Sequence, residues 1–434
     1  MTGGALATPF VMTSLAVLGM AGAALLYWLA FAHPRLGLYT LFALAPTQFI
    51  FVPVGSFHLS PADVVVFACG AGLCARLASG SQAAREAVRL HLMLGVLIAA
   101  YLIGFVILDH FSRTLIRLPL AFLPSILACE LLERRAHFSR AIAALIGAAL
   151  VDAAYGLFFV ALGQPLHPTR FSGLMGVNFS AMVLLTGAAM AFAILARTRE
   201  PVKLALPALL ALLAVATLSK SGVLALLVAA GLVLWKVATS GTRRWVLAAA
   251  MIGFVLVATQ DGVRDRVLAR AVPELEQDGV ERTSSGVRVR ILQSAWRALG
   301  EQPFVGLGYF NFQRYSTGDP DIHRSTAGVG YATHNTYLEV LVEGGILAFV
   351  PFLLHFLAFG TRLRNAFQAI VREQDVIAAA ALSGFIVIVV TAWAANVLIH
   401  YWFWSVAGVA LACLVQLDDP GFRTRTFDRS KAML

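Results

Sequence analysis

Charged residues are scarce in this chain. Only 13% of its 434 residues are charged, whereas 59% are hydrophobic and the mean hydropathy is +0.80. About a quarter of the residues of a typical soluble domain are charged, so this composition excludes that class. Apolar runs of about 20 residues each are needed to span a bilayer, and the sequence supplies about a dozen of them. We therefore predict an all-α, polytopic transmembrane helical bundle of about 12 spans.

Cysteine and lysine are also rare. The four cysteines, Cys69, Cys74, Cys129 and Cys413, all lie in apolar segments without metal-ligand spacing, so we predict neither a disulfide framework nor a metal site. With only four lysines, the preference for arginine is chain-wide and does not by itself indicate phosphate binding. The net charge of +10 lies mostly in short clusters between apolar runs, which is typical of cytoplasmic loops. No nucleic-acid partner is expected.

The apolar runs and basic clusters divide the chain into four parts. We predict transmembrane helices over residues 1–260, a large periplasmic loop over 261–333, C-terminal transmembrane helices over 334–417 and a cytoplasmic tail over 418–434. The first apolar stretch lacks a basic segment before it and is long enough to span, so it is not read as a cleavable signal. The candidate spans cover residues 9–31, 36–53, 62–79, 90–109, 114–132, 141–162, 174–196, 202–218, 221–237, 245–260, 335–359, 376–396 and 400–417.

The periplasmic loop contains nine arginines and nine acidic residues, and an amphipathic helix is predicted over 285–300. Helical periodicity places Arg288 within the apolar face of that helix, with Arg290 and Arg297 on the opposite face. A cation on a dry face is costly unless it meets an anion, so Arg288 is expected to point inward at one. Contact with lipid headgroups or with a carboxylate is the alternative. The apolar face comprises Val287, Ile291, Leu292, Ala295, Ala298 and Leu299.

His334 begins the next apolar run, and Thr333 is a candidate helix cap. The positive end of a helix disfavours the imidazolium form, so His334 is expected to be neutral and able to accept a proton. Lys220, in a turn between two apolar runs, and Arg170 are further candidate cations on the same outer side, although either can instead extend to lipid headgroups. The turns at 306–308 and 318–320 match neither a phosphate-binding loop nor a dinucleotide fingerprint, so neither ATP nor NAD is expected.

Four groups of residues follow one another along the chain: Arg170-Phe-Ser-Gly173 with Asn178, Ser219-Lys-Ser-Gly222, Arg288 with Pro303-Phe-Val-Gly-Leu-Gly308, and His334-Asn335 with Glu343-Gly-Gly345. Taken together and in this order, they resemble the O-antigen ligase superfamily of bacterial membrane glycosyltransferases. The resemblance covers residues 170–345 by motif and nearly the whole chain by hydropathy. One departure is Lys220, because this turn often carries arginine in the family; lysine keeps the charge but loses the bidentate geometry.

The resemblance implies a GT-C-like membrane glycosyltransferase in the bacterial inner membrane, with an active site that faces the periplasm. Such enzymes move a glycan from undecaprenyl diphosphate to an acceptor hydroxyl and use neither a nucleotide nor a metal cofactor. In the ligases the acceptor is the lipid A-core oligosaccharide, and membrane lipids surround the protein. The implied roles are a general base for His334, diphosphate binding for Arg288, Lys220 and Arg170, a further substrate contact for Arg290, and orientation of the site for Asn335 and Glu343.

Two alternatives remain open. An O-antigen or exopolysaccharide polymerase would share these motifs but would use a lipid-linked repeat unit as the acceptor. A single large outer segment near the C-terminus and the lack of an added soluble C-terminal domain favour the ligase. A lipid or polysaccharide transporter would instead place its charges near mid-membrane, in helices related by internal repeats, and the sequence has neither feature.

Overall fold

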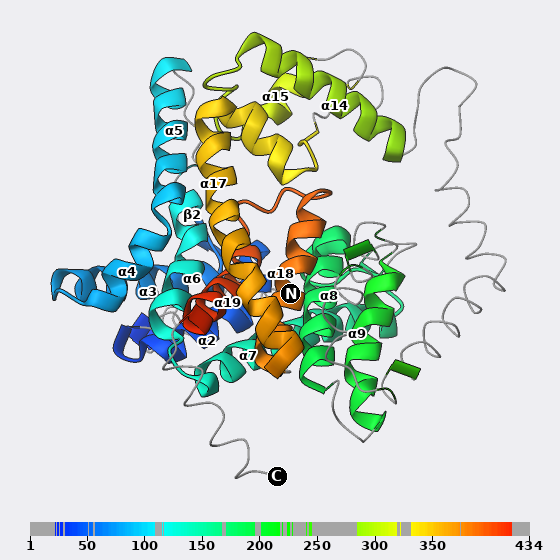
Figure 1. The fold of residues 1–434 in the computed structure, drawn as a ribbon. Helices are drawn as coiled ribbons and strands as arrows, with labels where there is room; N and C mark the ends of the chain where they lie inside the picture. Colours follow the sequence, from blue (N-terminus) through cyan, green and yellow to red (C-terminus); the bar gives the residue numbers. More distant parts are fainter. Residues whose placement is uncertain are drawn as a thin grey trace, which may run out of the picture.

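In the computed structural model, helices account for nearly all of the described chain (Figure 1). The structure describes residues 31–50, 52–54, 57–108, 117–166, 171–195, 201–217, 284–318, 331–373 and 375–418, with isolated residues elsewhere. Arg170, Lys220 and the side chain of Asn178 lie outside the described residues, as do most of the predicted spans 9–31, 221–237 and 245–260. The helices are α2 (Pro34–Leu44), α3 (Pro61–Ala78), α4 (Gln82–Leu90), α5 (Leu92–Leu108), α6 (Arg117–Leu131), α7 (Arg135–Ala161), α8 (Gly176–Leu195), α9 (Ala205–Ala216), α14 (Ser284–Glu301), α15 (Phe312–Thr317), α17 (Thr336–Glu373), α18 (Val376–Ala392) and α19 (Tyr401–Asp418).

Several of these helices are apolar enough to lie in a membrane. Among the described residues, three are both long and apolar enough to cross it: Pro61–Ala78, Arg135–Ala161 and Thr336–Gly360. The pair α4 and α5, bent by 57°, makes a fourth if it counts as one span. Four shorter apolar helices correspond to α8, α9, α18 and α19. An all-helical membrane protein is thus supported, whereas the predicted number of about 12 spans is not reached in this part of the chain.

The span predicted over residues 36–53 is wrong. α2 ends at Leu44, a 3-10 helix follows over Ala45–Phe49, and the chain then forms an antiparallel hairpin of β1 (Val52–Val54) and β2 (Phe57–Leu59). Proline lacks the amide hydrogen that an interior helical turn needs, and it clashes with the preceding turn. Pro46 and Pro53 therefore interrupt a run that hydropathy alone extends.

The bundle packs closely where small residues meet. α8 contacts α7, α9 and α18, and α19 contacts α6. A Cβ atom on Gly408 of α19 would lie 2.5 Å from Ser125 Cα of α6, so these two helices approach at backbone distance. Small residues allow such approach between helices in a membrane. Trp402 and Trp404 of α19 are fully buried in this core.

A second, smaller layer covers one end of the bundle. Figure 1 shows α14 and α15 lying across this end, beside the start of α17 and the end of α5. The layer has its own apolar cluster, separate from the main core. α14 occupies the segment for which the sequence predicts an amphipathic helix. The cluster consists of Ile291, Ala295, Ala298, Phe312, Ile322 and Val342.

Candidate functional site

The residues of the second layer are joined to α17 at a break in that helix. Gly345 has φ 62° and ψ −167°, which is not helical, so the amides that follow it are free to bond outside the helix. The loop over residues 303–308 supplies partners on both sides of the break. The backbone bonds are Ile346 N to Pro303 O (3.0 Å), Leu347 N to Phe304 O (3.1 Å), Leu307 N to Val342 O (2.9 Å) and Gly308 N to Glu343 O (2.8 Å).

Glycine is required at this junction for two reasons. Gly306, Gly308 and Gly345 all have positive φ, a conformation that costs other residues free energy. Space is also lacking, since a Cβ atom on Gly306 would lie 2.5 Å from the carbonyl carbon of Glu343. A Cβ atom on Gly345 would overlap the carbonyl of Phe304. The glycines of the two sequence motifs thus allow one backbone to lie directly on the other.

The Glu343 side chain holds the chain just beyond this junction. Its carboxylate accepts hydrogen bonds from Phe310 N (2.7 Å) and Phe312 N (3.2 Å), and Phe310 itself has a positive φ of 63°. Glu343 is buried, with 4% of its surface exposed. Its two oxygen atoms therefore orient the turn that leads into α15, through hydrogen bonds to the protein's own backbone.

His334 and Asn335 form the entry to α17. Asn335 Oδ1 accepts hydrogen bonds from Tyr337 N (3.0 Å) and Leu338 N (3.1 Å), so Asn335 caps the helix. The expectation that Thr333 is the cap is therefore wrong; Thr333 Oγ1 lies 3.0 Å from Asn335 O and 3.1 Å from Asn396 Oδ1. His334, directly before the cap, has φ 51°. A non-glycine residue in that region is uncommon and is often found at functional sites.

The start of α17 is also fixed from the other side. Thr336 Oγ1 donates to Ala395 O (2.7 Å) and accepts from Val397 N (2.9 Å), both in the connection between α18 and α19. Tyr331 contacts the His334 ring at a centroid distance of 5.7 Å. The strained His334 backbone is thus held between a capped helix and a bonded loop.

Arg288 lies close enough to His334 for its charge to act on the imidazole. Burial, and secondly the Arg288 charge, lower the pKa of His334 below its ordinary value of 6.5. Arg288 is exposed on one side, and the protein atoms on its other side partly desolvate it and lower its pKa from an ordinary value of 12.5, so the guanidinium stays charged near neutral pH. The structure thus brings together a neutral imidazole and a permanent cation.

The faces of α14 differ in detail from those that the sequence predicts. Ser294 is fully buried whereas Leu292 is 44% exposed, so the buried face is turned away from Leu292. Arg288, placed by periodicity within the apolar face, lies at its edge and is exposed, and Arg290, expected to face outward, is half-buried. The difference arises because periodicity gives the spacing of a helical face, while the neighbouring helices decide which part of it they cover.

Three further buried groups lie under this site and were not identified from the sequence. Glu339, one turn before Glu343 on α17, is 5% exposed. Its Oε2 atom and the Tyr101 hydroxyl have no hydrogen-bond partner within the described part of the chain. The Tyr101 ring meets that of Tyr309 at 4.9 Å, and burial, together with Glu339 and Glu343, raises the pKa of Tyr309 well above 10.0. The four-residue spacing of the two glutamates in an apolar run is the sequence signal that was available.

The described neighbours of Arg170 and Lys220 lie near each other. Phe171 N, next to Arg170, donates to Ala216 O (3.0 Å), four residues before Lys220. The segment after Phe171 is held by Asp152, a fully buried residue of α7 that the sequence did not single out. Asp152 Oδ1 lies 3.2 Å from Ser180 Oγ and 3.3 Å from Met175 N.

Part of this chain matches the model of a known protein family. Residues 205–353 match the family model described as O-antigen ligase. The matched region contains Lys220, Arg288, His334 and Glu343, while Arg170 lies before it. No curated protein sequence matches the chain. The family match confirms the resemblance that the motifs predict.

Proposed function

We propose that this chain, as a member of the O-antigen ligase superfamily, transfers a glycan from undecaprenyl diphosphate to the lipid A-core oligosaccharide at the periplasmic face of the inner membrane. The observation that carries the proposal is the state of His334. Its backbone is strained, and burial together with the Arg288 charge lowers its pKa below 6.5. A neutral imidazole next to a fixed cation is the pair that this transfer requires.

The chemistry needs a base and an anion-binding group. The acceptor hydroxyl attacks the anomeric carbon of the glycan, and the bond from that carbon to the diphosphate oxygen breaks. His334 takes the hydroxyl proton, which it can do only while it is neutral. Negative charge develops on the leaving diphosphate, and Arg288, assisted by Lys220 and Arg170, stabilises it.

The surrounding residues suit a positioning role. Asn335 fixes the helix start directly after His334, with bonds of 3.0 and 3.1 Å to the backbone. Glu343 orients the turn after the 303–308 loop, and this loop directly follows α14, the helix that carries Arg288. Arg290 is half-buried on α14 and is a further candidate for a substrate contact. The polyprenyl tail lies along the apolar helices, among the membrane lipids.

The choice of acceptor separates a ligase from a polymerase. Both chemistries use the same base and the same diphosphate contacts, so the geometry supports either. The reason to propose the lipid A core as acceptor is the single large outer segment predicted near the C-terminus.

The test is a transfer assay with purified protein in detergent. It contains undecaprenyl-diphosphate glycan and lipopolysaccharide that lacks O-antigen, without nucleotide and with a chelator. Wild type is compared with His334→Ala and with the control His33→Ala, which removes an exposed histidine at a position remote in sequence. Arg288→Gln is compared in the same way with Arg297→Gln, which removes an exposed arginine of the same helix.

Glycan on the lipid A core in wild type and the controls, but not in His334→Ala, supports the ligase and the base. Growth of the glycan on its own carrier instead identifies a polymerase. If a folded His334→Ala variant transfers at the wild-type rate, His334 is not the base. If folded wild type transfers to neither acceptor, the glycosyltransferase proposal is wrong and transport of a lipid-linked glycan becomes the hypothesis to test.

A further inference from the structure

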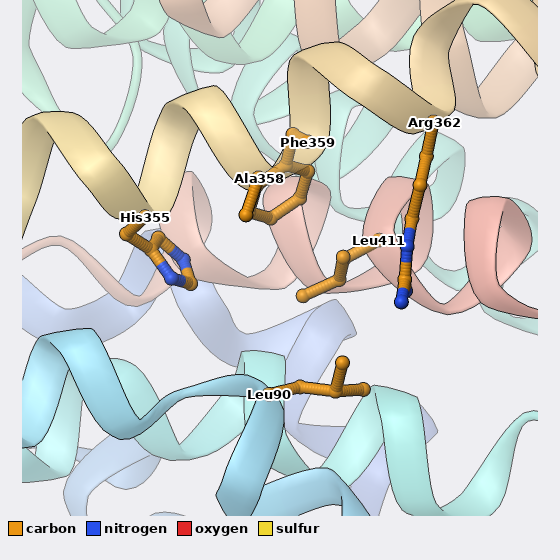
Figure 2. A pocket seen from close by; sticks show the side chains of 6 residues that line it. All are labelled: Leu90, His355, Ala358, Phe359, Arg362 and Leu411. Atoms are coloured by element: carbon orange, nitrogen blue, oxygen red, sulfur yellow. The ribbon is translucent and has the colours of Figure 1, made fainter.

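A cavity lies beside the middle of α17, along the part of the helix from His355 to Arg362. Figure 2 shows its lining side chains, which come from α4, α17 and α19. Its volume is about 180 Å³, enough for several water molecules or for one small charged head group. The lining residues are Leu90, His355, Ala358, Phe359, Arg362 and Leu411.

The position of the cavity along α17 matches a membrane surface. The apolar span of this helix ends at Gly360, so Arg362 lies just beyond it and His355 just within it. After the break at Gly345 the helix runs 17 residues to Arg362, which at about 1.5 Å per residue is roughly 26 Å. The hydrocarbon core of a bilayer is about 30 Å thick. The cavity therefore lies near the opposite surface from His334, where lipid phosphates are found.

The helix that leads into the cavity carries more basic than acidic residues. α4, which ends at Leu90, is strongly amphipathic and exposes Arg85, Glu86 and Arg89. Helices of this type lie in the membrane interface and attract anionic lipid heads.

Inside the cavity, one polar atom has no bonding partner. His355 is 2% exposed, and its Nε2 atom makes no hydrogen bond within the part of the chain that the structure describes. Its neighbour His91, 5.6 Å away between ring centroids, bonds instead to Ala87 O (2.8 Å) and Ser125 Oγ (2.7 Å). An unpaired buried polar atom costs free energy unless a ligand or water satisfies it.

We propose that this cavity binds the phosphate-bearing head of a membrane lipid. Arg362 pairs with the phosphate at the surface. His355 lies about 10 Å deeper, seven residues back along the helix, where its Nε2 atom bonds to an ester oxygen if the lipid is a phospholipid and to a water molecule if it is a polyprenyl phosphate. Leu90, Phe359 and Leu411 contact the start of the hydrocarbon chains. Two lipids carry this chemistry: an anionic phospholipid, which also has ester oxygens below its phosphate, and a polyprenyl phosphate, which has hydrocarbon there.

Native mass spectrometry of the detergent-purified protein tests the proposal. Phosphatidylglycerol and undecaprenyl phosphate are added in separate titrations, with phosphatidylcholine as the zwitterionic comparison. Arg362→Gln is expected to lower the bound fraction of at least one anionic lipid about fivefold. Ala358→Phe, which narrows an exposed edge of the cavity without changing charge, is expected to do the same. The matched control is Arg314→Gln, which removes an exposed arginine of α15 in the second layer.

The outcomes separate the two lipids. Loss of phosphatidylglycerol binding in Arg362→Gln and in His355→Phe identifies the bound lipid as a phospholipid, because His355 then bonds to an ester oxygen. Loss of undecaprenyl phosphate in Arg362→Gln, without an effect of His355→Phe, supports the polyprenyl carrier. Unchanged binding of both lipids in Arg362→Gln and Ala358→Phe overturns the proposal, as does an equal loss of binding in Arg314→Gln. Glycan transfer by each variant serves as the check that it is folded.

Discussion

Replacing Gly345 with alanine tests the junction between α17 and the layer that carries Arg288. Gly345 has φ 62° and ψ −167°, a region that is almost exclusive to glycine. A Cβ atom there would overlap the Phe304 carbonyl and would lie 2.7 Å from Gly306 N. The 303–308 loop therefore has to move away from the helix before the alanine fits.

The expected cost follows from these contacts. A residue held in such a backbone conformation costs on the order of 1–3 kcal/mol. Moving the loop also breaks the bonds from Ile346 N to Pro303 O and from Leu347 N to Phe304 O, each worth about 0.5–1.5 kcal/mol. Together these terms predict that Gly345→Ala lowers the free energy of unfolding by about 2–6 kcal/mol. Transfer activity is expected to fall as well, because Arg288 is supported by this layer.

Thermal unfolding in detergent, followed by circular dichroism, measures the stability term. Gly360→Ala is the matched control, since Gly360 lies in the same helix and nothing is within 4 Å of a Cβ atom there. This control is expected to match wild type or to exceed it by up to about 1 kcal/mol, the helix preference of alanine over glycine. If Gly345→Ala unfolds at the same temperature as Gly360→Ala, the reasoning about the junction is refuted.

Three further results are expected. The kcat/KM of transfer should fall at low pH with an inflection below 6.5, because the imidazolium form of His334 cannot accept a proton. Arg288→Gln should move that inflection upward but not beyond 6.5, since burial is the larger cause of the lowered pKa. An unmoved inflection in the pH–rate profile of Arg288→Gln contradicts this prediction. Asn335→Ala should lower the free energy of unfolding by about 1 kcal/mol through loss of the helix cap, whereas Asn335→Asp should keep the cap and the wild-type stability. Thermal unfolding measures the stability of both variants, and equal losses would argue against the cap. Glu343→Ala leaves the amides of Phe310 and Phe312 without their acceptor, which should lower the free energy of unfolding by about 1–3 kcal/mol for each amide that stays buried. Glu343→Gln keeps one oxygen as an acceptor and should lose less stability in the same thermal unfolding measurement.

Local hydropathy predicts many helices closely, because each one needs only an apolar run of sufficient length. The run at 174–196 corresponds to α8 (Gly176–Leu195), and the run at 400–417 to α19 (Tyr401–Asp418). The prediction fails at 36–53, where Pro46 and Pro53 break an apolar run. Hydropathy also fails to predict the 57° bend between α4 and α5, because the sequence there changes from polar to apolar without an interruption.

The chain sequence by itself determined that this is a helical membrane protein, which motifs it carries, and that His334 and Arg288 are candidate catalytic residues. Composition and short motifs are properties of neighbouring residues, so they can be read without a fold. Only the tertiary structure decided that Asn335 rather than Thr333 caps α17, and that the Glu343 carboxylate holds the backbone of Phe310. It also decided that Glu339 lies buried beneath the site and that Gly345 receives the 303–308 loop. These are contacts between residues distant in the chain, and their geometry depends on how the helices pack.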